Sequence, residues 1–203
     1  MQITAQMVKE LREATGAAFL DCKKALEEHD GDIARATEYL RQKGLATAAK
    51  KSERVASDGL VETYTHPGGR VGVMVEVNCE TDFVARTEQF AAFAHDLALH
   101  IAFHAPAYLK VEDIPQAKVE AKQAEFRRDA VAEGKPENVA DRIAEGRLNK
   151  WYEDVALLIQ PWIRDDSGKR TVQDVLTELV AELKENIVIR RFARYEIGEP
   201  EEA

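Results

Sequence analysis

The sequence predicts an α+β fold, with three short N-terminal helices followed by a three-stranded antiparallel sheet that is covered by helices. Apolar residues recur at helical spacing over residues 1–44. The period then changes to two on both sides of the turn Pro67-Gly68-Gly69, which indicates a hairpin. After further helical patterns, a run rich in β-branched and aromatic residues at 187–197 is expected to return to the hairpin as the third strand.

Short turns divide the first 44 residues into three predicted helices. Thr4 can cap the first helix, and Gly16 ends it. The second covers about residues 20–28, Asp32 can cap the third, and Gly44 is expected to stop it. The predicted apolar faces consist of Val8, Leu11, Ala14, Cys22, Ala25, Leu26, Ile33, Ala36, Thr37 and Leu40. A module of this size is near the lower limit for a core of its own.

Residues 45–58 lose the amphipathic period and gather basic side chains, so we interpret them as a tether, partly helical, that lets the module move. The predicted division is therefore a helical module at 1–44, a linker at 45–58 and a sheet-and-helix core at 59–203. The predicted hairpin strands are 60–66 and 70–78. One face of the second strand carries Val71, Val73, Val75 and Val77 and is expected to be buried.

The region between the hairpin and the last strand is predicted to be helical. Thr87 can cap a helix that Ala105-Pro106 ends, with Phe90, Phe93, Ala94, Leu97, Ala98 and Ile101 inward. A charged helix is expected at about 116–133, and another after Pro136, which suits a first turn. Thr171 can cap the last helix, whose inner face would consist of Val175, Leu176, Leu179, Val180 and Leu183.

Composition and charge narrow the class of protein. The 203 residues carry 37 acidic and 28 basic side chains, a formal net charge of −9, which argues against direct nucleic-acid binding. No apolar run is long enough for a membrane span, and the N-terminus lacks the pattern of a secretion signal. A cytoplasmic protein is expected, with Cys22 and Cys79 as reduced thiols; a disulfide is the alternative.

No catalytic or cofactor-binding pattern is found in the sequence. His100 and His104 could share a helix face as metal ligands, but they lack a third ligand and are better interpreted as surface or half-buried histidines. There is no phosphate-binding glycine loop and no nucleophile elbow. We therefore predict no metal, no cofactor and no enzymatic activity; an enzyme with an unrecognised site remains a weaker alternative.

The segment Cys79-Glu80-Thr81-Asp82-Phe83-Val84 connects the hairpin to the long helix and has two interpretations. Spacing alone favours Phe83 as a core residue that folds back under the loop. The alternative is an exposed aromatic wedge that enters a partner, because aromatic side chains on loops of rigid scaffolds are good binding anchors.

Several motifs, in order along essentially the whole chain, resemble the elongation factor Ts family. The N-terminal ones are Val8-Lys9-Glu10-Leu11-Arg12, Thr15-Gly16-Ala17, Asp21-Cys22-Lys23-Lys24-Ala25-Leu26 and Gly31-Asp32. The later ones are residues 78–85 (NCETDFVA), Gly134-Lys135-Pro136, Glu145-Gly146-Arg147-Leu148, Gln160-Pro161 and residues 191–198 (RFARYEIG). Several ordered motifs are far more specific than any one of them.

The resemblance implies guanine-nucleotide exchange on the translation GTPase elongation factor Tu. It implies an N-terminal module of the ubiquitin-associated type that docks on the GTPase through Arg12, Phe19, Leu20 and Lys23. The family commonly has glycine and methionine where this chain has Ala18-Phe19-Leu20, so the apolar character is kept but the individual contacts differ. The segment Thr81, Asp82, Phe83 and Val84 would bind near the Mg²⁺ and phosphate region, with Asp82 and Phe83 as the intruding residues.

Longer members of the family carry a second sheet subdomain and an inserted helical hairpin, and this chain resembles a short form with one sheet repeat. Half of the surface that contacts the GTPase would then be absent from a single chain. A homodimer that pairs through the sheet region is therefore expected. The alternative function is a ubiquitin-associated-like binding adaptor without exchange activity, which would not require the segment 81–84.

Overall fold

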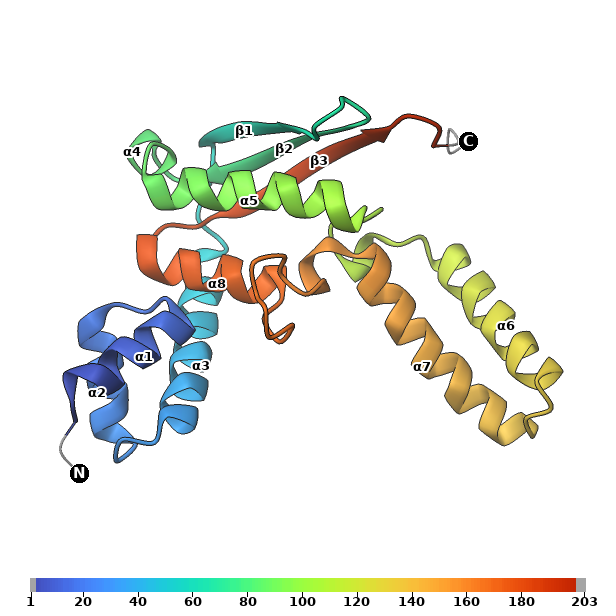
Figure 1. Ribbon diagram of the computed structural model, residues 1–203, viewed down its shortest axis with the longest axis horizontal. Helices are drawn as coiled ribbons and strands as arrows, with labels where there is room; N and C mark the ends of the chain where they lie inside the picture. Colours follow the sequence, from blue (N-terminus) through green and yellow to red (C-terminus); the bar gives the residue numbers. More distant parts are fainter. Residues whose placement is uncertain (1–2, 200–203) are drawn as a thin grey trace. The chain divides into compact units, whose positions relative to one another are not determined.

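A computed structural model describes residues 3–199 of the chain (Figure 1). The elements are α1 (Ala5–Thr15), α2 (Phe19–Glu28), α3 (Ile33–Lys51), β1 (Asp58–Thr65), β2 (Val71–Cys79), α4 (Asp82–Ala85), α5 (Glu88–His104), η1 (Val111–Asp113), α6 (Gln116–Ala132), α7 (Glu137–Val155), η2 (Leu157–Ile159), α8 (Val172–Leu183) and β3 (Val188–Glu196). The chain divides into two compact units, one of residues 3–64, 74–98 and 173–193, and one of 65–73, 99–172 and 194–199.

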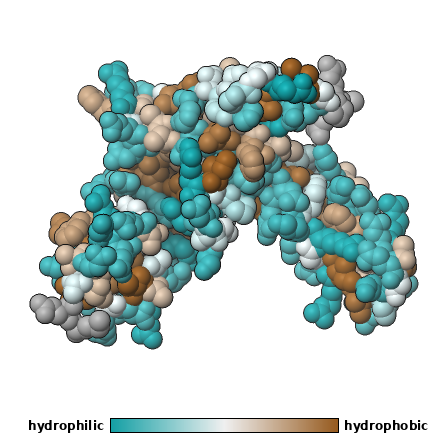
Figure 2. Space-filling model, viewed as in Figure 1, coloured by the Kyte–Doolittle hydropathy of each residue, from teal (hydrophilic) through white to brown (hydrophobic). Residues whose placement is uncertain are grey.

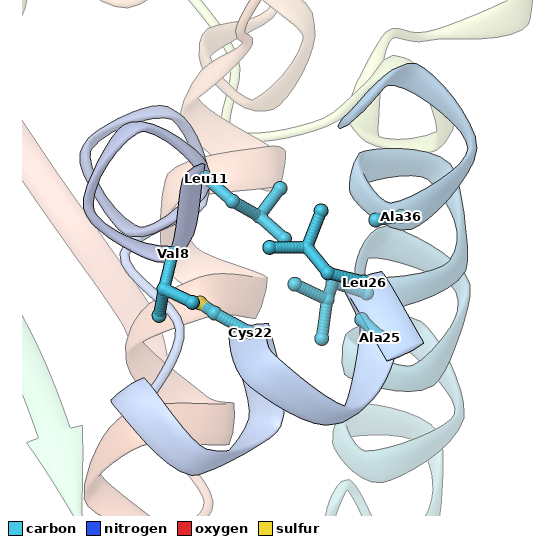
Figure 3. Packing of buried hydrophobic residues seen from close by; sticks show 7 residues of the cluster. Val8, Leu11, Cys22, Ala25, Leu26 and Ala36 are labelled. Carbon is cyan, nitrogen blue, oxygen red and sulfur yellow. The ribbon is translucent and has the colours of Figure 1, made fainter. Parts of the chain in front are cut away.

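In the first unit, α1, α2 and α3 pack around a small core (Figure 3). It consists of Val8, Leu11, Cys22, Ala25, Leu26, Ala36 and Leu40. The predicted caps are confirmed: the Thr4 side chain accepts from the Met7 amide at 3.3 Å, and Gly16 ends α1 with φ 66°. Ala14, predicted to face inward, is exposed. Thr15 takes the inward position instead, and its hydroxyl donates to the Leu11 carbonyl at 2.7 Å.

The prediction that Gly44 stops the third helix is wrong, because α3 continues through it to Lys51. Gly44 is buried, and a Cβ added there would lie 3.6 Å from Cγ2 of Thr177 on α8. That is an ordinary van der Waals distance, so the site has room for an alanine, and a single glycine does not end the helix because the alanine-rich residues that follow are good helix formers. The idea that 45–58 acts as a mobile tether stays a prediction.

The sheet has the order β1-β2-β3, and both neighbouring pairs are antiparallel, which confirms the predicted fold class. The His66 amide donates to the Val71 carbonyl at 2.9 Å, and the Ile197 amide donates to the Arg70 carbonyl at 3.0 Å. Along β2, Val73, Val75 and Val77 are buried as expected, whereas Val71 is half-buried. Figure 1 shows α5 along this face of the sheet, where His95 reaches Glu62 of β1 at 3.1 Å.

Helices α5 and α8 supply further buried apolar residues. The Thr87 hydroxyl accepts from the Phe90 amide at 3.3 Å, and the predicted apolar face of α5 is buried throughout. The helix ends at His104, and the next residue, Ala105, has a φ of 48°. On α8 the buried apolar residues are Val172, Leu176, Leu179 and Val180, while Val175 and Leu183 are only half-buried.

In the second unit, α6 and α7 lie side by side and form a helical hairpin (Figure 1). The sequence predicts both helices but not their pairing. Arg127 of α6 contacts Asp141 of α7 at 2.6 Å, and Arg147 of α7 contacts Glu133 at 2.8 Å. Gly134, with φ 80°, turns the chain between the two helices.

Candidate functional site

The segment between β2 and α5 is not an irregular connection: it contains one helical turn, α4. Thr81 caps this turn, since its Oγ1 accepts from the Val84 amide at 3.4 Å. Thr87 caps α5 six residues later. The T-D-F-V pattern carries the usual N-cap signal, so this turn could have been read from the sequence. We call Asp82 and Phe83, the first two residues of α4, the tip.

Phe83 is 81% exposed, so its interpretation as a core residue is wrong. The inward positions next to the turn are taken by Cys79, at the end of β2, and Phe90, in the first turns of α5, and both are fully buried. None of the residues of α4 is buried. In Figure 2, apolar atoms project from the surface at the position that α4 has in Figure 1.

The other three predicted residues of this segment, Thr81, Asp82 and Val84, are all half-buried. The Asp82 carboxylate lies 2.8 Å from the Arg86 guanidinium, one turn further along, and both side chains reach solvent. The segment therefore presents the Phe83 ring fully outward and the Asp82 carboxylate partly so.

A residue that the sequence reasoning missed, Glu185, holds the base of this turn. Its Oε2 accepts from the backbone amides of Glu80 and Thr81, at 3.0 Å each, and its Oε1 accepts from the Thr81 hydroxyl at 2.6 Å. In return, Oε1 of Glu80 accepts from the Asn186 amide at 2.6 Å. A lone glutamate after a helix is usually solvated, so no signal in the sequence could have identified it.

Glu185 lies in the short connection between α8 and β3, and this connection also contacts the end of α3. The Lys51 ammonium donates to the Lys184 carbonyl, and the Asn186 side chain donates to the Arg54 carbonyl at 2.7 Å. The Arg54 guanidinium lies 3.5 Å from the Glu80 carboxylate. Lys51 is 8% exposed, and its burial lowers the pKa of the ammonium group. The end of α3, the base of α4 and the start of β3 therefore form one hydrogen-bonded junction.

The Cys79 thiol lies beneath the tip and donates to the Thr81 carbonyl at 3.1 Å. Burial, with Glu185 nearby, raises its pKa to about 11. The group is thus a neutral thiol at physiological pH and a poor nucleophile. Cys22 and Cys79 are both free and buried.

The four residues expected to dock the N-terminal module are all exposed. Arg12 lies on α1, and the other three lie in the first two turns of α2. Phe19 and Leu20 are 51% and 68% exposed, and Lys23 pairs with Glu27 at 3.7 Å. Within residues 3–199, no hydrogen bond or ion pair joins this group to the tip, so the structure presents two separate candidate surfaces.

Neither a metal site nor a membrane helix is found in the part of the chain that the structure describes. No three His, Cys, Asp or Glu side chains among residues 3–199 are grouped to hold a metal ion. The His100 and His104 rings stack on each other, with centroids 4.4 Å apart. No helix in the same range is long and apolar enough to span a membrane.

Comparison with known proteins identifies the family. Residues 2–199 match the family model described as elongation factor TS. The chain is 57% identical over 197 residues to elongation factor Ts of Caldanaerobacter subterraneus, and the aligned residues cover 97% of this chain and 98% of the relative. It is 55% identical to that of Carboxydothermus hydrogenoformans (97% and 90%) and 53% identical to that of Maridesulfovibrio salexigens (98% and 96%). The chain therefore belongs to the elongation factor Ts family of translation factors.

Proposed function

We propose that this chain is a guanine-nucleotide exchange factor for elongation factor Tu, and that its tip enters the GTPase beside the Mg²⁺ and phosphate region. Membership of the elongation factor Ts family supports the exchange role. The single observation that carries the mechanism is that Phe83 is 81% exposed on a turn that hydrogen bonds hold in place. An exposed aromatic side chain on a rigidly held connection is a common anchor of protein–protein interfaces.

The tip would act by displacement and charge. A phenyl ring wedged beneath a switch element moves that element away from the nucleotide. The Asp82 carboxylate, once it leaves Arg86 for the partner, changes the charge around the metal ion. Neither side chain forms a covalent bond, so the chain needs no nucleophile or cofactor for this role.

The energy that this mechanism requires is substantial. A nanomolar nucleotide complex is worth about 12 kcal/mol, so weakening it by three or four decades takes roughly 4–6 kcal/mol of coupling. By linkage, bound nucleotide must weaken the exchange factor by the same factor. One loop is too small to supply this alone, which is why a second contact is needed.

The N-terminal module is the proposed second contact. Phe19 and Leu20 expose apolar surface at the start of α2, and Arg12 and Lys23 supply positive charge nearby. An apolar centre with a charged rim is typical of a docking patch. The module would hold the GTPase while the tip opens its nucleotide site.

A homodimer is the proposed assembly. The face of the sheet opposite α5 exposes Val61 of β1 and Met74 of β2, at 57% and 54%. On the same face the Arg191 guanidinium lies 2.7 Å from Glu76, and this lowers the pKa of that carboxyl. An apolar centre beside an ion pair suits the pairing of two copies of this face.

Release of labelled GDP from elongation factor Tu tests the proposed function. The wild-type chain should accelerate release, and Phe83→Ala should lose most of the acceleration while its melting temperature stays near that of wild type. Phe103→Ala is the matched control, because Phe103 is 75% exposed and lies at the other end of α5. It should accelerate release as well as wild type does.

The same assay separates the alternatives. A chain that binds elongation factor Tu but leaves GDP release unchanged is an adaptor, and the exchange function is then wrong. Equal activity of Phe83→Ala and wild type would keep the exchange function but remove the tip from it.

A further inference from the structure

We infer that Glu185 is a positioning residue for exchange, which fixes the tip in the orientation that enters the partner. The inference rests on the proposed function of Asp82 and Phe83. Glu185 lies outside residues 78–85, 102 positions after Phe83 in the sequence. In this role it does not need to contact the nucleotide or the partner.

Glu185 accepts hydrogen bonds from the residues directly before the tip. One carboxylate oxygen accepts from two consecutive backbone amides, those of Glu80 and Thr81, at 3.0 Å each. The other accepts from the Thr81 hydroxyl at 2.6 Å. Hydrogen bonds to an ionised acceptor are stronger and more directional than neutral ones. Residues 80 and 81 therefore have a fixed orientation relative to the end of α8.

Packing contributes little to this orientation, so the hydrogen bonds carry most of it. No residue of α4 is fully buried, and a helix of four residues is not stable alone. Thr81 both caps α4 and binds Glu185, so the carboxylate fixes the residue from which the helical turn starts. Without the Glu185 contacts, the tip would sample several orientations, and the fraction ready for insertion would fall.

The residues on either side of Glu185 are themselves held by hydrogen bonds. Lys184 has φ 59° and its amide donates to the Val180 carbonyl at 3.0 Å, which ends α8 and turns the next residue toward the β2–α4 segment. Asn186 binds both Glu80 and Arg54. Lys51 at the end of α3 binds the Lys184 carbonyl. The N-terminal module and the tip are thus connected through the residues on either side of Glu185.

The rate of GDP release, measured over a range of concentrations of this chain, separates a positioning role from a role in binding. We expect Glu185→Ala to lower the saturating rate of GDP release from elongation factor Tu by about tenfold or more, the effect of losing one net hydrogen bond in the transition state. The half-saturating concentration should change less, because the module patch is intact. Glu185→Gln should retain most of the rate, since its amide can still accept from both backbone amides and donate to Thr81.

The matched control is Glu182→Ala, which removes the same charge three residues earlier, from an exposed position at the end of α8. It should leave both kinetic parameters unchanged. If Glu185→Ala fails to fold, as judged by circular dichroism, Glu185→Asp replaces it. The aspartate is one methylene too short to reach both Thr81 and Glu80, so the same drop in saturating rate is expected.

A double-mutant cycle tests whether Glu185 acts through the tip. In a Phe83→Ala background, Glu185→Ala should add little further loss, because the group that it orients is already gone. Additive losses would overturn the positioning role, and so would wild-type rates for Glu185→Ala or Glu185→Asp. If instead Phe83→Ala alone has wild-type activity, the tip mechanism of the proposed function fails, and this outcome is distinct from the others.

Discussion

His100 shows how a single side chain can be fixed by its surroundings. It is fully buried on α5, its Nε2 lies 3.0 Å from Oε1 of Gln160, and its Nδ1 accepts from the Ile163 amide at 3.3 Å. The Trp162 ring stacks on it at 5.5 Å. The proton is therefore on Nε2, and the neutral imidazole joins α5 to the segment that follows α7. The expectation of a surface or half-buried histidine is wrong for His100, whereas His104 is half-buried.

The stability of the protein should depend on pH through this residue. Burial lowers the pKa of His100 from 6.5 to about 4. As the pH falls below 6.5, the unfolded chain binds a proton that the folded chain does not bind, so stability falls until about pH 4 and then levels off. The full loss is about 3 kcal/mol. Urea unfolding at a series of pH values measures it.

One variant assigns this pH dependence to His100. His100→Gln should be less stable at neutral pH and should have a shallower slope between pH 4 and 6.5. A His100→Gln protein with the wild-type slope would show that other groups cause the dependence.

Single glycines show which elements tolerate a side chain. Gly146 lies inside α7, is exposed and has no atom within 4 Å of a Cβ added there. Gly146→Ala should therefore raise the free energy of unfolding by about 0.5–1 kcal/mol, because alanine costs less backbone entropy in a helix. Denaturant unfolding of the variant checks this value.

Gly134 is the control for this prediction. It has equally open space around its Cβ position, but its φ is 80° at the turn between α6 and α7. Gly134→Ala should therefore lower stability by about 1 kcal/mol, since an L side chain is strained there. If both substitutions shift stability in the same direction, backbone conformation is not what separates the two sites.

The helices and strands also show which parts of the fold can be predicted from the sequence alone. Caps and apolar periods are local signals, and they correctly predict α1, the start of α5 and the valine face of β2. The prediction at Gly44 failed because one glycine is a weak stop signal, and the helix formers after it carry α3 on to Lys51. Glu185 was missed because its partners lie about 105 residues away. Contacts between distant segments have no periodicity that a single sequence reveals.

At the scale of the whole molecule, the open sheet face predicts self-association. We expect the chain to be a dimer in light scattering, because Val61 and Met74 leave an apolar centre on that face. Met74→Lys should shift the protein to monomers, since two buried ammonium groups would face each other without partners. Val55→Lys is the control, because Val55 is 79% exposed in the segment between α3 and β1.

Circular dichroism should show that both lysine variants are folded. A wild-type chain that is monomeric at working concentration would contradict the dimer. So would a Met74→Lys protein that elutes as wild type does.

In the proposed mechanism, the exposed Phe83 ring, held by the junction beneath it, drives nucleotide release. The most direct test measures GDP release from elongation factor Tu over a range of wild-type and Phe83→Ala concentrations, together with the affinity of each for the nucleotide-free GTPase. Phe83→Ala should still bind through the N-terminal module, but its saturating release rate should fall by at least about tenfold. A saturating rate for Phe83→Ala equal to that of wild type would contradict a role of the Phe83 ring in nucleotide release.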